Sequence, residues 1–196
     1  MTGSEENTTA VHRARIGSQA VDLPLVVVNE HLTIALLVTI DHGVGFIDTA
    51  GRELADLLRD TRPEIVVSAA TLGIPVALEV SRHLGLDDYL ILQKSPKVHL
   101  RDALRESVES ITSDGGQVFL LDRARVDAVR GRRVVFVDDV VSTGSSTAAA
   151  LRLLDRAGAE VVGIGALLTE GDGWRGALGD RAHLVRALGS IPLFRS

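Results

Sequence analysis

Hydrophobic and polar residues follow two different periods along the chain, and each period predicts a type of element. Apolar, largely β-branched runs predict strands, whereas apolar residues three or four positions apart predict helices. From residue 64 onward the two patterns alternate. Predicted strands cover 64–69, 89–94, 117–122, 134–137 and 159–169, and predicted helices cover 74–84, 123–129 and 146–157. This alternation predicts an α/β fold with a mostly parallel sheet flanked by helices.

Less regular segments precede and interrupt this series. Segments 23–28 and 32–38 predict a hairpin, and 48–61 predicts a helix with Asp48 as its N-cap. Residues 1–12 are mostly polar and predict a disordered tail, so a single domain is expected over 13–196. The polar stretch from 95 to 114 predicts an irregular connection.

Composition narrows the fold further. The chain has 196 residues, enough for one domain with a full core, and its aromatic content of only 3% leaves Val, Leu, Ile and Ala to fill that core. Such cores are typical of helix-covered parallel sheets. The absence of cysteine excludes disulfides, thiolate catalysis and Cys-ligated zinc, and fits a reducing cytoplasm.

Charge and hydropathy exclude two classes of partner. A formal net charge of −5 gives no general attraction to nucleic acid, which binds basic surfaces. The first residues lack the cationic start and apolar run of a secretion signal, and no apolar stretch is long enough to span a membrane. We therefore expect a soluble cytoplasmic protein without nucleic-acid or membrane partners.

The candidate chemistry lies in residues 134–146, VVFVDDVVSTGSS. Burying an unpaired carboxylate costs several kcal/mol, so Asp138 and Asp139 should reach water, a cation or hydrogen-bond donors where the predicted strand ends. Ligands of open α/β sheets bind beyond this end of the strands. The small residues that follow can wrap backbone N–H groups around an anion, with Gly144 allowing the unusual dihedral angles. The segment predicts a phosphate cradle beside two carboxylates that bind sugar hydroxyls or a hydrated divalent cation.

Other interpretations of these motifs fit less well. In one interpretation the segment has no ligand: Ser and Thr only cap a helix, and the aspartates face solvent. A P-loop needs a lysine after its last glycine, and the 43–48 segment has only two of the three glycines of a dinucleotide fingerprint. A receiver domain carries its paired acids near its start, whereas too few residues follow Asp138 to complete one.

VVFVDDVVSTGSS closely resembles the phosphoribosyl pyrophosphate (PRPP) signature of type I phosphoribosyltransferases. Three further segments are similar to the adenine phosphoribosyltransferase-like branch: SAATLGIPVALEVSRHLG to its pyrophosphate loop and following helix, LQKSPKVHL to its basic strand end, and LGSIPLF to its last strand. The resemblance covers about residues 20–196. It implies the type I phosphoribosyltransferase fold with a flexible hood over about 95–116.

The resemblance also implies a role for each matching residue. Asp138 and Asp139 would hold the ribose hydroxyls and the water shell of Mg²⁺. The 5′-phosphate would be bound by Ser142, Thr143, Gly144, Ser145 and Ser146. The pyrophosphate loop would be formed by Thr71, Leu72 and Gly73. Lys94 and Lys97 would meet the leaving group or the substrate of a neighbouring subunit. Trp174 would either stack on a purine or fill a surface gap or subunit contact.

The implied activity is transfer of ribose 5-phosphate from PRPP to a purine base, with adenine first, in a homodimer. Two alternatives stay open: a PRPP-binding regulatory module without turnover, and an enzyme acting on a 6-oxopurine or a pyrimidine. Leu72 and Gln93 support the first alternative, because relatives commonly carry Lys and Arg there. In the hood, Glu106, Glu109 and Thr112 are candidates for the acidic hood position, and His99 is the histidine placed near substrate.

Overall fold

The computed structural model describes residues 10–95, 102–108 and 117–194, and no helix within these ranges is long and apolar enough to cross a membrane. A five-stranded parallel sheet in the order β10-β9-β8-β4-β5 forms its centre. The strands are β4 (Ile65–Ala69), β5 (Tyr89–Leu92), β8 (Arg133–Val141), β9 (Glu160–Glu170) and β10 (Val185–Ile191). The helices are α1 (Gly43–Leu58), α2 (Gly73–Leu84), α3 (Ser145–Arg156) and α4 (Gly173–Leu178). The predicted α/β fold is confirmed.

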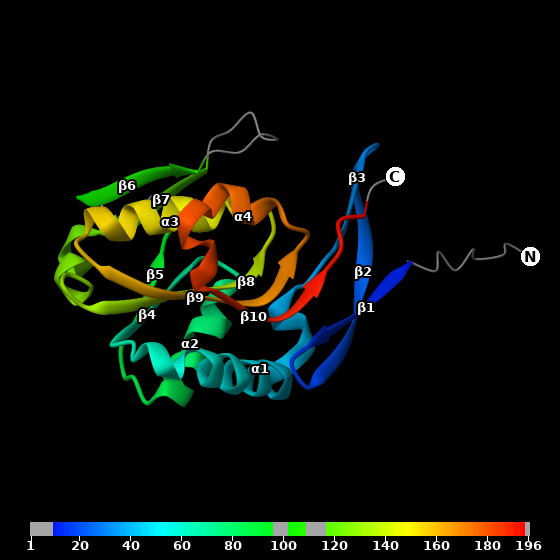
Figure 1. Cartoon of the computed structure of the whole chain (residues 1–196), viewed down its shortest axis with the longest axis horizontal. Helices are drawn as coiled ribbons and strands as arrows, with labels where there is room; N and C mark the ends of the chain where they lie inside the picture. Colours follow the sequence, from blue (N-terminus) through cyan, green and yellow to red (C-terminus); the bar gives the residue numbers. More distant parts are fainter. Residues whose placement is uncertain (1–9, 96–101, 109–116, 195–196) are drawn as a thin grey trace, which may run out of the picture.

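The helices cover the two faces of the sheet, α1 and α2 on one and α3 and α4 on the other (Figure 1). Successive residues of the central strand β8 serve opposite faces, as the pleat of a strand requires. Val134 and Phe136 join the core under α3, whereas Val135 and Val137 join the core under α1 and α2. Burying each such side chain stabilises the fold by about 1.5–3 kcal/mol. Both faces are therefore needed to hold β8 in place.

Two small antiparallel units flank the central sheet. One consists of β1 (Val11–Ile16), β2 (Gln19–Asn29) and β3 (Leu32–Ala35), and it meets β10 where the Gly17 N–H donates to the Leu188 carbonyl at 3.0 Å. The other is the ribbon of β6 (Ala103–Val108) and β7 (Gln117–Asp122), which lies beside α3 (Figure 1). Short 3₁₀ turns cover Thr39–His42, Arg59–Thr61, Arg123–Ala128 and Gly179–Leu184.

Several predicted boundaries were wrong in these flanking units. The sequence pattern missed β1, which starts at Val11 inside the segment expected to be a tail. It also missed β6 within the stretch expected to be irregular. Only three of the six side chains of β6 are apolar and they form no continuous run, so backbone pairing with β7 supports the strand. The segment 123–129 forms a 3₁₀ rather than an α-helix, capped by Asp122 accepting from the Ala124 N–H at 3.0 Å.

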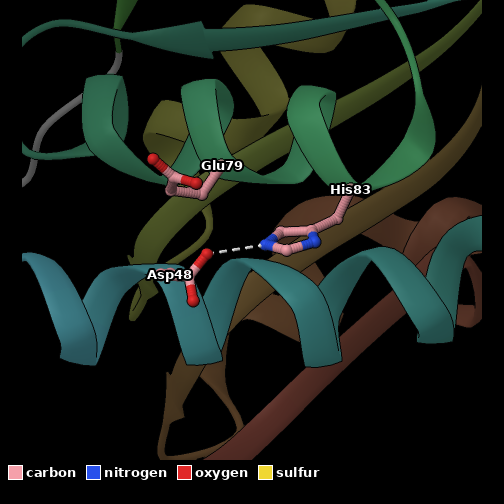
Figure 2. Close-up of side chains that lie close together, drawn as sticks. All are labelled: Asp48, Glu79 and His83. Atoms are coloured by element: carbon pink, nitrogen blue, oxygen red, sulfur yellow. Dashed lines mark hydrogen bonds and ion pairs between the residues drawn. The ribbon is translucent and has the colours of Figure 1, made fainter.

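The predicted N-cap role of Asp48 was also wrong. Helix α1 begins at Gly43 because its buried face already starts at Phe46 and Ile47, so Asp48 lies within the helix. Figure 2 shows Asp48 pointing from α1 toward α2, where its Oδ1 lies 2.9 Å from Nε2 of His83. Asp48 thus ties two helices together on the covered face of the sheet.

Candidate active site

Two loops meet above the carboxyl ends of neighbouring strands. The first, residues 70–72, connects β4 to α2, and the second, residues 142–144, connects β8 to α3. β4 and β8 pair in parallel, so both loops leave the same edge of the sheet. Ligands of open α/β sheets bind at this edge.

The second loop has a shape that only glycine supports. Gly144 has a φ of +82°, and a Cβ added there would lie 2.9 Å from the backbone Cα of Trp174. Helix α3 starts at the next residue, with the Ser145 N–H donating to Thr143 Oγ1 at 3.3 Å. The first N–H groups of an α-helix have no acceptor within the helix and carry the positive end of its dipole. The loop therefore has the geometry of an anion cradle.

The first loop is held by contacts from three other elements. Thr39 Oγ1 donates to the Leu72 carbonyl at 2.9 Å. A Cβ on Gly73 would lie 2.1 Å from Ser68 Oγ and 2.9 Å from Asp138 Oδ1, so the loop packs directly against both residues. Ser68 Oγ is buried and has no hydrogen-bond partner among the described residues. Gly73, which follows the first loop, consequently lies next to Asp138, although the two residues are far apart in sequence.

Asp138 and Asp139 occupy this meeting point. Strand β8 continues beyond them to Val141, so the expectation that the strand ends at the aspartates was wrong. The Asp139 N–H donates to Asp138 Oδ1 at 3.1 Å. Burial, and then the charge of Asp139, raise the pKa of Asp138 well above its ordinary value, while Lys94 acts in the opposite direction. The Asp138 carboxyl group is therefore both shielded from solvent and repelled by the charge of its neighbour.

This repulsion makes the pair suitable for a divalent cation. Adjacent carboxylate oxygens are the ligands that Mg²⁺ prefers, either directly or through its water shell. A cation between the strand end and the loops would also favour the charged form of Asp138. Lys94 is the cationic side chain that acts on Asp138, and its Nζ lies 5.9 Å from the centre of the Phe119 ring. Lys97 lies outside the described residues.

Residues 39–185 match the family model described as the phosphoribosyl transferase domain. The chain belongs to this family. It is 48% identical over 67 residues to the adenine phosphoribosyltransferase of Streptomyces avermitilis, covering 34% of each chain. It is 34% identical over 122 residues to the orotate phosphoribosyltransferase of Listeria monocytogenes, covering 61% of this chain and 49% of that one. The predicted family membership is confirmed.

The fold is shared with solved phosphoribosyltransferases. The Saccharomyces cerevisiae adenine phosphoribosyltransferase, in complex with an imino-altritol bisphosphate and adenine, superposes with a TM-score of 0.66 and 20% identity. This match covers 91% of this chain and 94% of the other. The chain spans about half the length of the orotate relatives that it matches. The relatives act on different bases, so the family assignment leaves the base open.

Trp174 lies beside the cradle of this phosphoribosyltransferase domain. It is 4% exposed, its Nε1–H donates to the Gly171 carbonyl at 3.1 Å, and the Arg175 guanidinium lies 4.2 Å from its ring. A hollow of about 450 Å³ opens next to it, lined by Thr169, Gly171, Asp172, Trp174, Arg175, Ser190, Ile191 and Pro192. Trp174 supports the Gly144 turn by packing and also lines this hollow.

Gln93, just before the predicted hood region, and Glu106 within it both have structural contacts. Gln93 exchanges two backbone hydrogen bonds with Leu120, which anchors the β6–β7 ribbon to the end of β5. Glu106 accepts from Arg152 Nε at 2.7 Å and from Arg156 at 2.9 Å. The hydrogen bond from Arg152 is the largest cause that lowers the pKa of Glu106. Three further hood candidates, His99, Glu109 and Thr112, lie outside the described residues.

Three residues near the site were missed in the sequence. Thr39 fixes the Leu72 carbonyl, Ser68 packs under Gly73, and Glu170 accepts a hydrogen bond from Ser142. Each lies within or at the end of an apolar run, where a polar residue gives no local signal of its partner. Only the folded arrangement of distant strands brings them to the loops.

A second group of titratable residues lies away from the site. Asp48, Glu79 and His83 each offer a ligand atom, and these atoms lie within 4.8 Å of one another (Figure 2). Glu79 pairs with Arg82 at 3.0 Å, and Asp48 pairs with His83. Because these charges are already paired, we assign the group to the packing of α1 against α2.

Proposed function

We propose that the protein is a Mg²⁺-dependent phosphoribosyltransferase that transfers ribose 5-phosphate from PRPP to a purine base. The products are a nucleoside monophosphate and pyrophosphate. The convergence of the Gly144 cradle, the two aspartates and the Gly73 loop at one sheet edge carries this proposal. The 48% identical segment of an adenine enzyme makes adenine the first candidate base.

The 5′-phosphate of PRPP binds at the N-terminus of α3. Backbone N–H groups of 142–146 point at its oxygens, and the helix dipole favours its negative charge. Asp138 and Asp139 accept hydrogen bonds from the two ribose hydroxyls, since carboxylates accept and do not donate. The same two carboxylates would hold Mg²⁺, directly or through its water shell, and the ion would supply positive charge to the pyrophosphate.

The reaction needs stabilisation of the departing pyrophosphate more than a nucleophilic side chain. Bond breaking at C1′ leaves positive charge on the ribose and adds negative charge to the leaving group. Backbone amides of 71–73 and the Lys94 ammonium donate to that developing charge. Asp138, whose Oδ1 would lie 2.9 Å from a Cβ at Gly73, would favour the cationic ribosyl group through its negative charge.

The base binds near the hollow beside Trp174, the residue that packs against Gly144 of the phosphate cradle. The same proposal includes a cytoplasmic homodimer. Exposed apolar side chains at Ile40 and Val44, 62% and 81% exposed, support a subunit contact close to the first loop. Lys97 would act at the leaving group of this subunit or of its neighbour.

A pyrophosphate-release assay tests the function. Wild type is incubated with PRPP, Mg²⁺ and each of adenine, hypoxanthine, guanine, xanthine and orotate. We expect release with adenine, and omission of the base or Mg²⁺ abolishes it. Release with orotate alone would overturn the purine assignment.

The alternative to an enzyme is a PRPP sensor, a protein that binds PRPP without turnover. Leu72 is the residue that supports this alternative, because it lacks the charge of a lysine. A lysine in this position adds a cationic donor to the leaving group, so Leu72→Lys in an enzyme raises the rate by up to about a hundredfold. Leu78→Lys is the matched control, because it adds the same charge at an exposed position of α2 away from the loop. Saturable PRPP binding without pyrophosphate release by wild type or Leu72→Lys would establish the sensor instead.

A further inference from the structure

Glu170 is a buried acid directly behind the phosphate cradle. It is the last residue of β9 and is only 6% exposed. Its Oε2 accepts a hydrogen bond of 2.5 Å from Ser142 Oγ, across the edge between β8 and β9. Hydrogen bonds of hydroxyls to carboxylates are short and about twice as strong as neutral ones. Ser142 is thus fixed by a residue that lies 28 positions later in the chain.

This hydrogen bond changes what Ser142 can do. A hydroxyl has a single proton to donate. Ser142 already donates this proton in its hydrogen bond to Glu170 Oε2, so its Oγ can only accept further hydrogen bonds. Ser142 therefore cannot donate to a phosphate oxygen. The backbone of the loop and the hydroxyls of Thr143, Ser145 and Ser146 are the donors left for the phosphate.

The second oxygen of Glu170 indicates that this acid is not placed there for stability alone. Glu170 Oε1 is buried and makes no hydrogen bond within the part of the chain that the structure describes. An unpaired buried polar atom destabilises the folded state, because it has lost its hydrogen bonds to water. Such exceptions are few in native structures and call for an explanation, such as stored strain or a catalytic role.

We propose that Glu170 is a positioning residue that holds Ser142, and with it the 142–144 loop, in the shape that binds the 5′-phosphate of PRPP. This inference rests on the proposed function. Glu170 touches neither phosphate nor ribose and acts only through the Ser142 hydroxyl. A residue with a merely structural role would lower stability without changing the affinity for PRPP.

A double-mutant cycle on PRPP binding tests the inference. The dissociation constant of PRPP with Mg²⁺ is measured by calorimetry for wild type, Glu170→Ala, Ser142→Ala and the double variant. We expect each single change to weaken binding about tenfold, the loss of one hydrogen bond to a charged group. The double variant should bind no more weakly than the single ones, because both changes remove the same interaction.

Two further variants separate positioning from general damage. Glu170→Gln keeps an oxygen that accepts from Ser142, so its affinity should stay within about threefold of wild type. Glu160→Ala removes an acid at the other end of β9, where it pairs with Arg133 on the surface, and should leave affinity unchanged. The inference would be overturned if the double variant lost affinity for PRPP by the product of the two single losses. It would also be overturned if Glu170→Ala bound PRPP as tightly as wild type.

Failure of the proposed function would be recognised separately, as an absence of PRPP binding by wild type. Amide hydrogen exchange of residues 143–146 then decides the role of Glu170 without ligand. Faster exchange to the same extent in Glu170→Ala and Ser142→Ala supports positioning of the loop. Exchange at the wild-type rate in Glu170→Ala would contradict it.

Discussion

The two loops of the active site both depend on a glycine without room for a side chain, but for different reasons. At Gly144 the obstacle is the backbone of Trp174, and the φ of +82° is itself unfavourable for any other residue. At Gly73 the obstacles are the side chains of Ser68 and Asp138, and the backbone is helical. The 142–144 loop is therefore fixed by backbone geometry, whereas the 70–72 loop and Gly73 are fixed by side chains that can be exchanged.

Gly144→Val should have the largest effect of any single change at the site. It combines a strained positive φ with contact against the backbone of α4, and each contributes about 1–3 kcal/mol. The free energy of unfolding measured in urea should fall by about 3 kcal/mol or more, and PRPP binding should be lost. A second substitution that shortens a neighbouring side chain should not restore PRPP binding. A stable Gly144→Val variant that binds PRPP would refute the account of this loop.

Asp138→Asn separates stability from binding at the point where the loops meet. The raised pKa of Asp138 means that the folded state favours its neutral form, so its contribution to stability is present below about pH 3.8 and declines as the pH rises through the raised pKa. Asn should therefore make the protein more stable than wild type at pH 7 and similar to it near pH 3.5. PRPP binding should weaken about a hundredfold, the loss of about 2.7 kcal/mol.

Urea unfolding at several pH values, with PRPP titration at pH 7.5, measures both effects of Asp138→Asn. Asp22→Asn, on exposed β2, is the control for loss of one negative charge. Lower stability of Asp138→Asn than of wild type at pH 7 would contradict this account, because it would mean that other groups of the protein stabilise the charged form of Asp138.

Gly73→Ala tests the first loop, because the side chain nearest to a Cβ at residue 73, that of Ser68, can be shortened. The new methyl group meets Ser68 Oγ first, and overpacking of this kind costs about 1–3 kcal/mol. Ser68→Ala removes that oxygen and leaves Ser68 Cβ at 3.5 Å, an ordinary contact, together with Asp138 Oδ1 at 2.9 Å, which must still move. The Gly73→Ala, Ser68→Ala double variant should therefore recover part of the lost stability in urea unfolding. Additive losses would mean that Ser68 is not the obstacle.

The same difference explains which parts of the site the sequence predicted. The cradle is encoded within a few adjacent residues, so Asp138, Asp139 and Gly144 could be identified from 134–146 alone. The first loop depends on Thr39 and Ser68, which contact it through folding, and neither carries a local signal. Strand β6 was missed for a related reason, since pairing with β7 rather than its own side chains forms it. Regular apolar periods, in contrast, identified four of the five strands of the central sheet, whereas β10 was indicated only by the resemblance of LGSIPLF to a last strand.

Glu106→Gln should have the smallest effect and gives a reference outside both loops. It removes the charge that Arg152 and Arg156 bind, with an expected loss of about 0.5–1 kcal/mol. Because the pKa of Glu106 is lowered, this stability is present above about pH 4.5 and is lost as the pH falls. Urea unfolding should show a larger difference from wild type at pH 7 than at pH 3.5. A difference at pH 3.5 as large as at pH 7 would contradict the ion pair.

The binding of PRPP with Mg²⁺ to the wild-type protein tests the central claim most directly. Unfolding is followed by urea or heat with increasing PRPP, in the presence and absence of Mg²⁺. Binding to the two loops predicts a saturable, Mg²⁺-dependent stabilisation of about 2.7 kcal/mol at a PRPP concentration 100 times the dissociation constant. No stabilisation at millimolar PRPP with Mg²⁺, or an equal stabilisation of Gly144→Val, would contradict it.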